Sequence, residues 1–424
     1  MTLILGIILV TLLLLGTPLF IIISSLALYY FHQIDVDTSA IMIDMYRIAN
    51  APVLIAIPLF TFAGYILSES KTPERLVSLS RAFLGWLPGG LAVVAIVACS
   101  IFTAFTGASG VTIIALGGLL YPTMIKEGYP EKFSLGVLTT SGSRGLLFPP
   151  SLPIIIFGFV AGVSIDKLFA AGLIPGIIVV GAFSIYSIFK GSRSEVPKIP
   201  FNLKNALKSV RGAAWEVPLP ILILGGIYSG ILTVSEAAAF TAFYVLVVEV
   251  LIYRDIKIRE VPKIMRESML LVGGILIILG AALGFTNYLV YEQVPMKIME
   301  YMSNYITSEL MFLMALNIFL LVVGCMMDIF SAIIVVVPLI VPIAKEFDVN
   351  MVHLGIVFLT NLEIGFSTPP VGMNLFIASF RFNKPVVKLY AAAVPFLILS
   401  ILCLLLITYV PQLSTFLPDL LNVR

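Results

Sequence analysis

Two clusters of glycine, proline and polar residues interrupt long apolar stretches of the sequence, at 140–150 (TSGSRGLLFPP) and at 360–370 (TNLEIGFSTPP). A proline inside a helix removes a backbone donor and clashes with the preceding turn, which frees carbonyl oxygens. The clusters therefore predict two helices that are broken in the middle. The helix-breaking residues are Gly145, Pro149 and Pro150 in the first, and Gly365, Pro369 and Pro370 in the second.

The two breaks offer ligands of one chemical kind. The hydroxyl groups of Ser141, Thr360 and Thr368 and the amide oxygen of Asn361 add to the freed carbonyls. Hard cations prefer such all-oxygen sets, as Ca²⁺ and Mg²⁺ do, so we interpret the breaks as candidate Na⁺ sites. The simpler alternative is a kink that packs against a neighbouring helix, but two matching breaks favour ion binding.

Three ionisable side chains lie in the same regions. Arg144 and Glu363 occupy nearly corresponding positions in the two clusters. They either pair inside the membrane, or the planar fork of Arg144 receives a carboxylate of the substrate. Asp328 lies near the centre of the apolar stretch 310–342, where it either helps to hold a cation or caps the start of a helix.

A possible nucleophile suggests a different class of function. Residues 107–110 (GASG) fit the GxSG pattern of intramembrane serine proteases. That chemistry needs a histidine within hydrogen-bond reach of Ser109. The sequence has only His32 and His353, and both are expected at the outer membrane boundary, so the protease is a remote alternative.

The elements that position these residues must lie in a lipid bilayer. The 424 residues are 60% apolar and 11% charged, with a mean hydropathy of +1.11, whereas soluble domains are about 25% charged. At about 20 apolar residues per helix, the chain supplies some ten to fourteen membrane segments, the first within 1–31. A net charge of +2 leaves no basic surface for nucleic acid, and no nucleotide-binding motif points to ATP use.

Charge sets the expected orientation. The loop 190–211 carries six Lys or Arg residues against Glu195 alone, and such loops stay in the cytoplasm. Counting crossings from this loop places Met1 inside and Arg424 outside.

The two halves of the chain match each other, which predicts an all-α polytopic membrane protein with inverted repeats. Each half contains a re-entrant helical hairpin (about 82–125 and 310–343) followed by a broken helix (about 131–165 and 352–380), and a span near 215–233 inverts the second copy. Such repeats are typical of secondary transporters. The predicted units are scaffold spans at 1–81, a transport-domain half at 82–165, scaffold spans at 166–309, a second transport-domain half at 310–380 and a C-terminal span at 381–424.

Three runs carry a resemblance to a known family. They are 105–117 (FTGASGVTIIALG), 141–151 with its Gly142 and paired prolines, and 361–376, which ends STPPVGMNLF. Together they closely resemble the large, DctM-type membrane subunit of TRAP transporters, the tripartite ATP-independent periplasmic uptake systems of bacteria and archaea. The resemblance extends over essentially the whole chain.

The resemblance implies a sodium-coupled symporter with an elevator-type fold in the cytoplasmic membrane. A separate small membrane subunit and an extracytoplasmic solute-binding protein are the implied partners, and the solute is a small organic acid. The implied Na⁺ ligands are Thr106, Gly107, Ser109, Ser141, Gly142, Asp328, Asn361, Gly365 and Thr368, and the candidate substrate contacts are Arg144, Glu363, Thr112 and Asn374.

The chain departs from the family pattern in two places. Asp328 is followed by Ile329 where proline is frequent, and Arg144 stands where a small or apolar residue is commoner. The alternative function is a standalone sodium-coupled dicarboxylate or anion carrier of the related fold.

Overall fold

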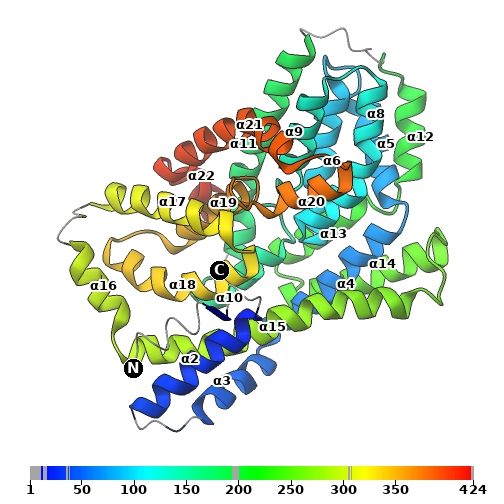
Figure 1. Cartoon of the computed structure of the whole chain (residues 1–424). Helices are drawn as coiled ribbons and strands as arrows, with labels where there is room; N and C mark the ends of the chain where they lie inside the picture. Colours follow the sequence, from blue (N-terminus) through cyan, green and yellow to red (C-terminus); the bar gives the residue numbers. More distant parts are fainter. Residues whose placement is uncertain are drawn as a thin grey trace.

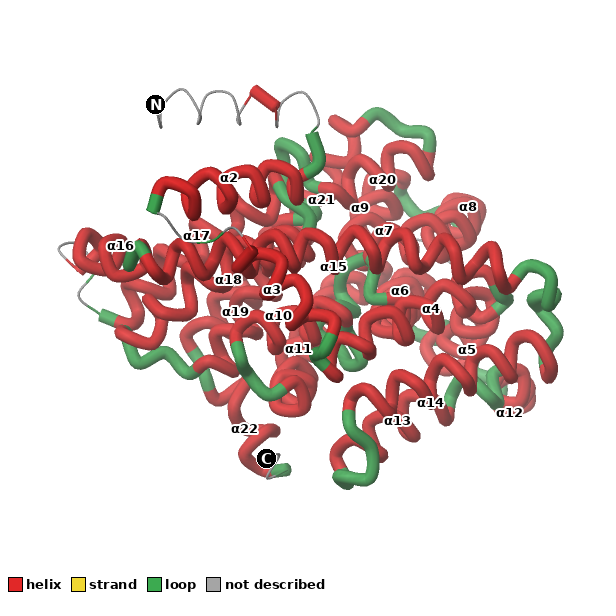
Figure 2. The backbone as a smooth tube through the Cα atoms, turned by 90° about the horizontal axis from the view of Figure 1, so that it is seen from below, coloured by secondary structure: helices red, strands yellow, loops and turns green. Residues whose placement is uncertain are grey.

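The computed structural model describes residues 11–12, 17–34, 37, 39–192, 200–303, 306 and 308–421, and every regular element in these ranges is helical (Figure 2). The all-α prediction is therefore confirmed for the described residues. Much of the predicted first span (1–10 and 13–16) and part of the basic loop (193–199) lie outside them, as does the C-terminal Arg424.

The elements follow the polar breaks in the sequence. Those of the first half are α2 (Leu19–Gln33), α3 (Ser39–Ala49), η1 (Pro52–Ile55), α4 (Ala56–Glu69), α5 (Thr72–Leu84), α6 (Gly90–Thr106), α7 (Ser109–Thr112), η2 (Ile113–Gly117), α8 (Gly118–Lys126), α9 (Glu131–Ser141), α10 (Leu152–Ala161) and α11 (Ile165–Ser192). Those of the second half are α12 (Leu203–Gly212), α13 (Pro218–Tyr228), α14 (Val234–Leu246), η3 (Val247–Ile252), α15 (Val261–Tyr291), α16 (Val294–Ser303), α17 (Glu309–Met326), α18 (Ile329–Glu346), α19 (Met351–Gly365), α20 (Met373–Phe382), α21 (Val386–Tyr409) and α22 (Gln412–Leu420).

Eight helical stretches in the described ranges are long and apolar enough to cross a membrane: 52–69, 109–126, 165–192, 234–252, 261–291, 309–326, 329–346 and 386–409. Five further apolar helices have 10 to 17 residues. The estimate of ten to fourteen segments counted apolar residues alone. The structure divides several of those stretches into shorter helices, because glycine and proline interrupt them.

Two groups of helices pack against each other (Figure 1). In one group, α15 contacts α2, α3 and α4, and α14 packs on α4. In the other, α6, α9, α11, α19 and α21 contact one another. The second group holds both glycine-proline clusters, and its helices are the most deeply buried, since every residue of 134–141 and 353–365 is buried.

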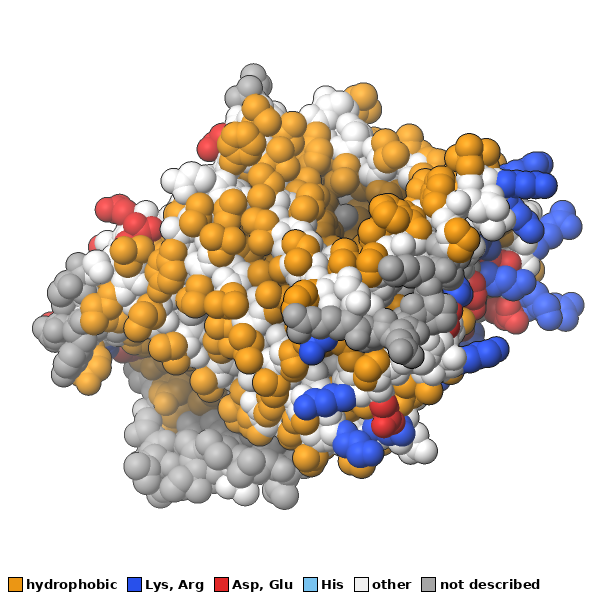
Figure 3. Space-filling view, turned by 90° about the horizontal axis from the view of Figure 1, so that it is seen from above, with side chains coloured by type: hydrophobic (Ala, Val, Ile, Leu, Met, Phe, Trp, Pro, Cys, Tyr) orange, Lys and Arg blue, Asp and Glu red, His pale blue; other side chains and the backbone are white. Residues whose placement is uncertain are grey.

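The outer surface of the described residues is strongly apolar. Figure 3 shows hydrophobic side chains over most of one face, with Lys and Arg side chains gathered toward its right-hand edge. Exposed residues on α17 include Met314, Ile318 and Val322, which recur at helical spacing. An apolar belt with charges at its edge is the surface that a bilayer requires.

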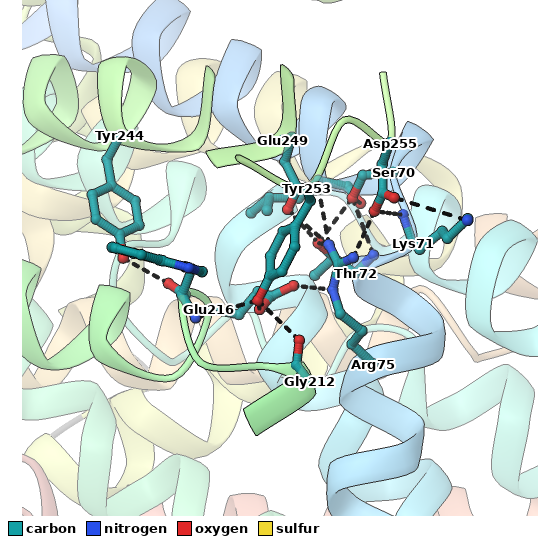
Figure 4. A network of polar contacts seen from close by, with 12 residues as sticks. Ser70, Lys71, Thr72, Arg75, Gly212, Glu216, Tyr244, Glu249, Tyr253 and Asp255 are labelled. Carbon is teal, nitrogen blue, oxygen red and sulfur yellow. Dashed lines mark hydrogen bonds and ion pairs between the residues drawn. The ribbon is translucent and has the colours of Figure 1, made fainter. Parts of the chain in front are cut away.

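A network centred on Arg75 fixes the start of α5 (Figure 4). The Arg75 guanidinium pairs with Glu216, lies 2.9 Å from Glu249 Oε2 and lies 2.6 Å from Asp255 Oδ2. The Tyr253 ring covers the guanidinium at 4.0 Å. Glu216 follows α12, and the other partners lie within or directly after η3, so the network ties α5 to two distant segments.

The rest of this network is also closely bonded. The hydroxyl of Thr72 donates to Glu249 at 3.0 Å, and the Tyr253 hydroxyl lies 3.0 Å from Glu216 Oε2. Burial, with the nearby Glu216 carboxylate, raises the pKa of Tyr253 to about 12. Tyr253 is therefore neutral at physiological pH and acts as a hydrogen-bond donor.

Candidate functional site

The first break separates α9 from α10. Residues 142–151 between them are irregular, and all but Phe148 are buried. The Thr103 hydroxyl of α6 donates to the carbonyl oxygen of Gly142 at 2.8 Å, and its oxygen lies 2.6 Å from the Thr112 hydroxyl. Thr112, a candidate substrate contact, is therefore engaged within the protein.

Two hydroxyl groups beside this break make no hydrogen bond to the described residues. Thr106 Oγ1 and Ser141 Oγ are buried and find no hydrogen-bond partner among the residues that the structure describes. Between α6 and α7, Gly107 has a φ of 64°, a conformation that glycine adopts without strain. Buried polar groups are normally paired, so these two oxygens on contacting helices have an unused capacity to accept a hydrogen bond or a cation.

Ser109 joins the first half of the chain to the second. Its hydroxyl donates to Asn374 Oδ1 at 2.8 Å, and Asn374 belongs to α20. The other amide atom, Asn374 Nδ2, is buried without a partner in the described ranges. The two regions predicted from the sequence thus come together, and an unused donor remains at the point where they meet.

The expected surface position of His353 is wrong. His353 is fully buried in α19, where Nδ1 lies 2.7 Å from Ser414 Oγ and Nε2 lies 3.1 Å from the Thr408 carbonyl oxygen. Packing of α22 against α19 covers this side chain. Ser109 bonds to Asn374 instead of a histidine, so the geometry of a serine protease is not formed.

The second break follows α19, and residues 366–372 connect it to α20. The amide nitrogen of Asn361 donates to Asn317 Oδ1 at 2.7 Å and to the Val357 carbonyl at 2.9 Å. Asn361 Oδ1 is buried and has no partner among the described residues. Because both donor bonds fix the amide, its oxygen is held in one orientation.

Asp328 and Thr368, two other predicted ligands of this half, already make hydrogen bonds within the protein. Asp328 Oδ2 accepts from the Ser331 amide at 2.9 Å and caps the start of α18. Thr368 donates to the Ile364 carbonyl at 2.8 Å, so its lone pairs are still available as acceptors. Pro369 and Pro370 are exposed, whereas Pro149 and Pro150 are buried.

Gly365 is required by a close contact between α17 and α19. A Cβ atom on Gly365 would overlap the carbonyl carbon of Gly324, and one on Gly324 would lie 3.1 Å from the Leu362 Cα atom. The two backbones therefore approach closely beside the second break.

We expect Gly365→Ala to destabilise the protein by about 1–3 kcal/mol, because overpacking against backbone forces the helices apart. Thermal unfolding in detergent measures the loss. Gly225→Ala is the matched control, since nothing lies within 4 Å of an added Cβ there, and it should gain about 0.5–1 kcal/mol. Equal midpoints for both variants would contradict the close contact.

Arg144 and Glu363 form an ion pair between the two breaks. Arg144 Nη1 lies 3.2 Å from Glu363 Oε1, and the side chains are 0% and 1% exposed. The guanidinium also donates from Nε to the Thr140 carbonyl at 3.1 Å and lies 4.6 Å from the Phe183 ring centre. These contacts support the internal pair of the two interpretations made from the sequence, although Arg144 Nη2 and Glu363 Oε2 have no hydrogen-bond partner among the described residues.

Sequence reasoning missed three residues that support these groups. Thr103 binds the Gly142 carbonyl, Asn317 orients Asn361, and Phe183 covers Arg144. Asn317 could have been found from the sequence, because a polar residue within an apolar membrane helix indicates a functional contact. The role of Phe183 has no local signal, because one aromatic residue among many apolar ones carries no positional information.

Comparisons with known proteins agree with this architecture. Residues 5–413 match the family model described as "Tripartite ATP-independent periplasmic transporter, DctM component". The chain is 35% identical to the C4-dicarboxylate TRAP transporter large permease protein DctM of Pseudomonas aeruginosa, over 91% of this chain and 90% of that protein. It is 31% identical to the ectoine/5-hydroxyectoine TRAP transporter large permease protein UehC of Ruegeria pomeroyi, over 97% of each.

A fused relative and a solved structure extend the comparison. The isethionate TRAP transporter permease protein DctMQ of Oleidesulfovibrio alaskensis is 35% identical over 86% of this chain, which spans 58% of that longer protein. The YdaH transporter of Alcanivorax borkumensis has the same overall fold, with a TM-score of 0.64 at 14% identity over 88% of each chain. The chain therefore belongs to the DctM family, the large permease component of TRAP transporters, and is a multi-pass membrane transport protein and not an enzyme.

Proposed function

We propose that this protein takes up a small organic acid by sodium symport, as the large subunit of a binding-protein-dependent TRAP transporter. One observation carries the sodium coupling. Ser141 Oγ at one break and Asn361 Oδ1 at the other are buried oxygens without a hydrogen-bond partner in the described ranges. A dehydrated cation needs such oxygens, and two breaks provide two places for it.

The proposed mechanism uses the two halves as inverted repeats. α6 to α10 (within 82–165) and α17 to α20 (within 310–380) form a transport domain, which moves as an elevator against scaffold spans from 1–81 and 166–309. α11 and the C-terminal α21 move with this domain, because α11 packs on α6 and α19, and α21 packs on α9 and α19. In support, the half at 82–165 contacts the half at 310–380 in two places. Ser109 bonds to Asn374, and Arg144 pairs with Glu363. Such cross-bonding suits a unit that moves as one body.

The proposed Na⁺ sites carry over the ligands expected from the sequence. Thr106, Gly107, Ser109, Ser141 and Gly142 serve the first site, and Asp328, Asn361, Gly365 and Thr368 serve the second. Each Na⁺ that moves inward gains about 2.3 kcal/mol per 100 mV of membrane potential. Entry of two with a monoanion would use both the gradient and the potential.

Solute class and partners follow from the relatives. The named relatives transport C4-dicarboxylate, isethionate or ectoine, and all three compounds are small and polar with an acidic group. Among the candidate substrate contacts, Asn374 Nδ2 and Arg144 Nη2 each retain a donor without a hydrogen-bond partner in the described ranges. The fused DctMQ relative supports a small membrane subunit as one partner, and a solute-binding protein is the other.

Sodium titration tests the coupling directly. Thermal unfolding of the purified protein is followed as NaCl replaces choline chloride at constant ionic strength. A ligand that binds only the folded state stabilises it, by about 1.4 kcal/mol at ten times its Kd. We expect a saturable rise that is specific to sodium, and an unchanged midpoint would overturn sodium coupling.

Uptake into vesicles tests the tripartite assignment. The permease is reconstituted with the small subunit, with and without the binding protein. We expect uptake only when the binding protein is present. Equal uptake in its absence would instead assign the protein as a standalone carrier.

A further inference from the structure

The short helix α12 has two distinct faces, and both are exposed. Leu203 and Leu207 are 64% and 62% exposed, and Val210 continues their apolar stripe. Lys204, Lys208 and Arg211 form a basic stripe beside it, at the same helical spacing. The helix is well formed, because the Asn202 side chain accepts from the Lys204 amide at 2.9 Å.

A pocket of about 510 Å³ lies beside the contact between α12 and α5. Arg81 and Lys208 supply positive charge to its wall, and Ser78, Asn202 and Asn205 supply polar groups. Trp86 also lines it and is 51% exposed. The two helices meet where the Ser78 and Ser209 hydroxyls lie 3.2 Å apart and where Ala206 is buried.

Among the described residues, the cations of α12 are uncompensated, whereas two other cations that line the pocket are already paired. Arg75, which also borders the pocket, is saturated by three carboxylates, and Arg81 pairs with Glu127. The three cations of α12 form no ion pair within the part of the chain that the structure describes. The segment 200–212 contains no acidic residue. Figure 3 shows Lys and Arg side chains along one edge of the apolar surface.

We propose that this pocket binds the headgroup of an acidic phospholipid, and that α12 lies in the same leaflet with Leu203, Leu207 and Val210 among the acyl chains. A helix with a basic polar face and an exposed apolar face lies in the membrane interface. Exposed tryptophan marks the same depth. The basic loop that contains α12 is expected in the cytoplasm, whose leaflet carries anionic lipid.

Lipid is the occupant that fits both stripes at once. A free phosphate would use the basic groups but would leave the apolar stripe in water. Adjacent apolar and basic stripes match the acyl chains and phosphate of one phospholipid. This site is separate from the proposed Na⁺ sites, because its residues lie on α5 and α12.

The test uses the purified full chain in detergent and short-chain phosphatidylglycerol as the probe, with binding followed by native mass spectrometry. Each basic residue beside an anionic lipid contributes about fivefold to affinity. The triple variant Lys204→Gln/Lys208→Gln/Arg211→Gln should therefore bind phosphatidylglycerol at least about tenfold more weakly. Glutamine preserves helix propensity, so the fold is retained. Leu207→Gln should weaken lipid binding without changing any charge.

The matched control is Lys257→Gln/Arg259→Gln/Lys263→Gln, which removes three exposed cations from the first turn of α15 and the loop before it. It should change the affinity by less than about twofold. Equal losses in both triple variants would show diffuse charge attraction and overturn the site. So would equal binding of short-chain phosphatidylcholine, competition by inorganic phosphate at the lipid's own concentration, or unchanged affinity in the α12 variants.

Discussion

Replacing Glu363 with glutamine is expected to destabilise the protein by about 3–5 kcal/mol, because removal of one partner leaves a buried charge uncompensated. The Arg144 guanidinium stays protonated. Glu363 is the one carboxylate that pairs with it among the described residues. The loss is measured as the fall in the midpoint of thermal unfolding in detergent. Arg144→Met should be similarly destabilising, since it strands Glu363.

Removal of both charges should restore most of this stability. Buried ion pairs are often replaced by well-packed apolar residues with little or no loss, so Arg144→Met/Glu363→Met is expected within about 1–2 kcal/mol of the unmodified protein. Glu267→Gln is the control, because its pair with Lys263 is exposed and 3.8 Å long. Its effect should stay below about 1 kcal/mol.

The double variant also separates the two roles considered for Arg144. Arg144 is 1% exposed and already engaged by Glu363, the Thr140 carbonyl and Phe183. We therefore expect the double variant to retain solute uptake. A stable double variant without uptake would show that Arg144 contacts the solute, and an additive double-mutant cycle would contradict the pair.

Alanine at Asn361 is expected to remove most of the sodium-dependent stabilisation. The fixed amide oxygen is lost, and the apparent Kd for sodium should rise at least about tenfold, which corresponds to about 1.4 kcal/mol. The measurement is the sodium titration of thermal unfolding. Asn361→Ala also breaks the hydrogen bond to Asn317, so the test needs a second site variant that breaks no bond within the protein.

Ser141→Ala, at the other break, is such a variant. Ser141 Oγ is without a hydrogen-bond partner in the described ranges, so its removal breaks no bond within the protein and should leave stability in choline unchanged. Sodium affinity should fall by a similar factor. Ser400→Ala is the control, since its buried hydroxyl already donates to the Phe396 carbonyl at 2.7 Å. Full sodium dependence in both site variants would reject these oxygens as ligands.

Much of the local structure could be read from composition and spacing. The helical class, the break after Ser141 and the break after Gly365 are all observed where glycine and proline predicted them. Asp328 caps α18, as the placement of an aspartate before an apolar helix indicates. These features depend on neighbours in the chain, so the sequence carries them directly.

The internal contacts required the folded structure. Three outcomes depend on residues that lie elsewhere in the sequence. They are the ion pair of Arg144, the hydrogen bond of Thr112 and the burial of His353. His353 illustrates the point, because α22 covers it through Ser414. The sequence alone suggested a side chain at the surface of the outer membrane boundary.

By itself, the sequence determined the membrane class, the all-helical fold, the two broken helices and the family, because these follow from hydropathy, backbone restrictions and long matching motifs. Only the tertiary structure decided which polar atoms are already bonded and which remain open, such as Asn361 Oδ1 and Ser141 Oγ. The physical reason is that burial and hydrogen bonding depend on the packing of distant helices. No local pattern of residues specifies that packing atom by atom.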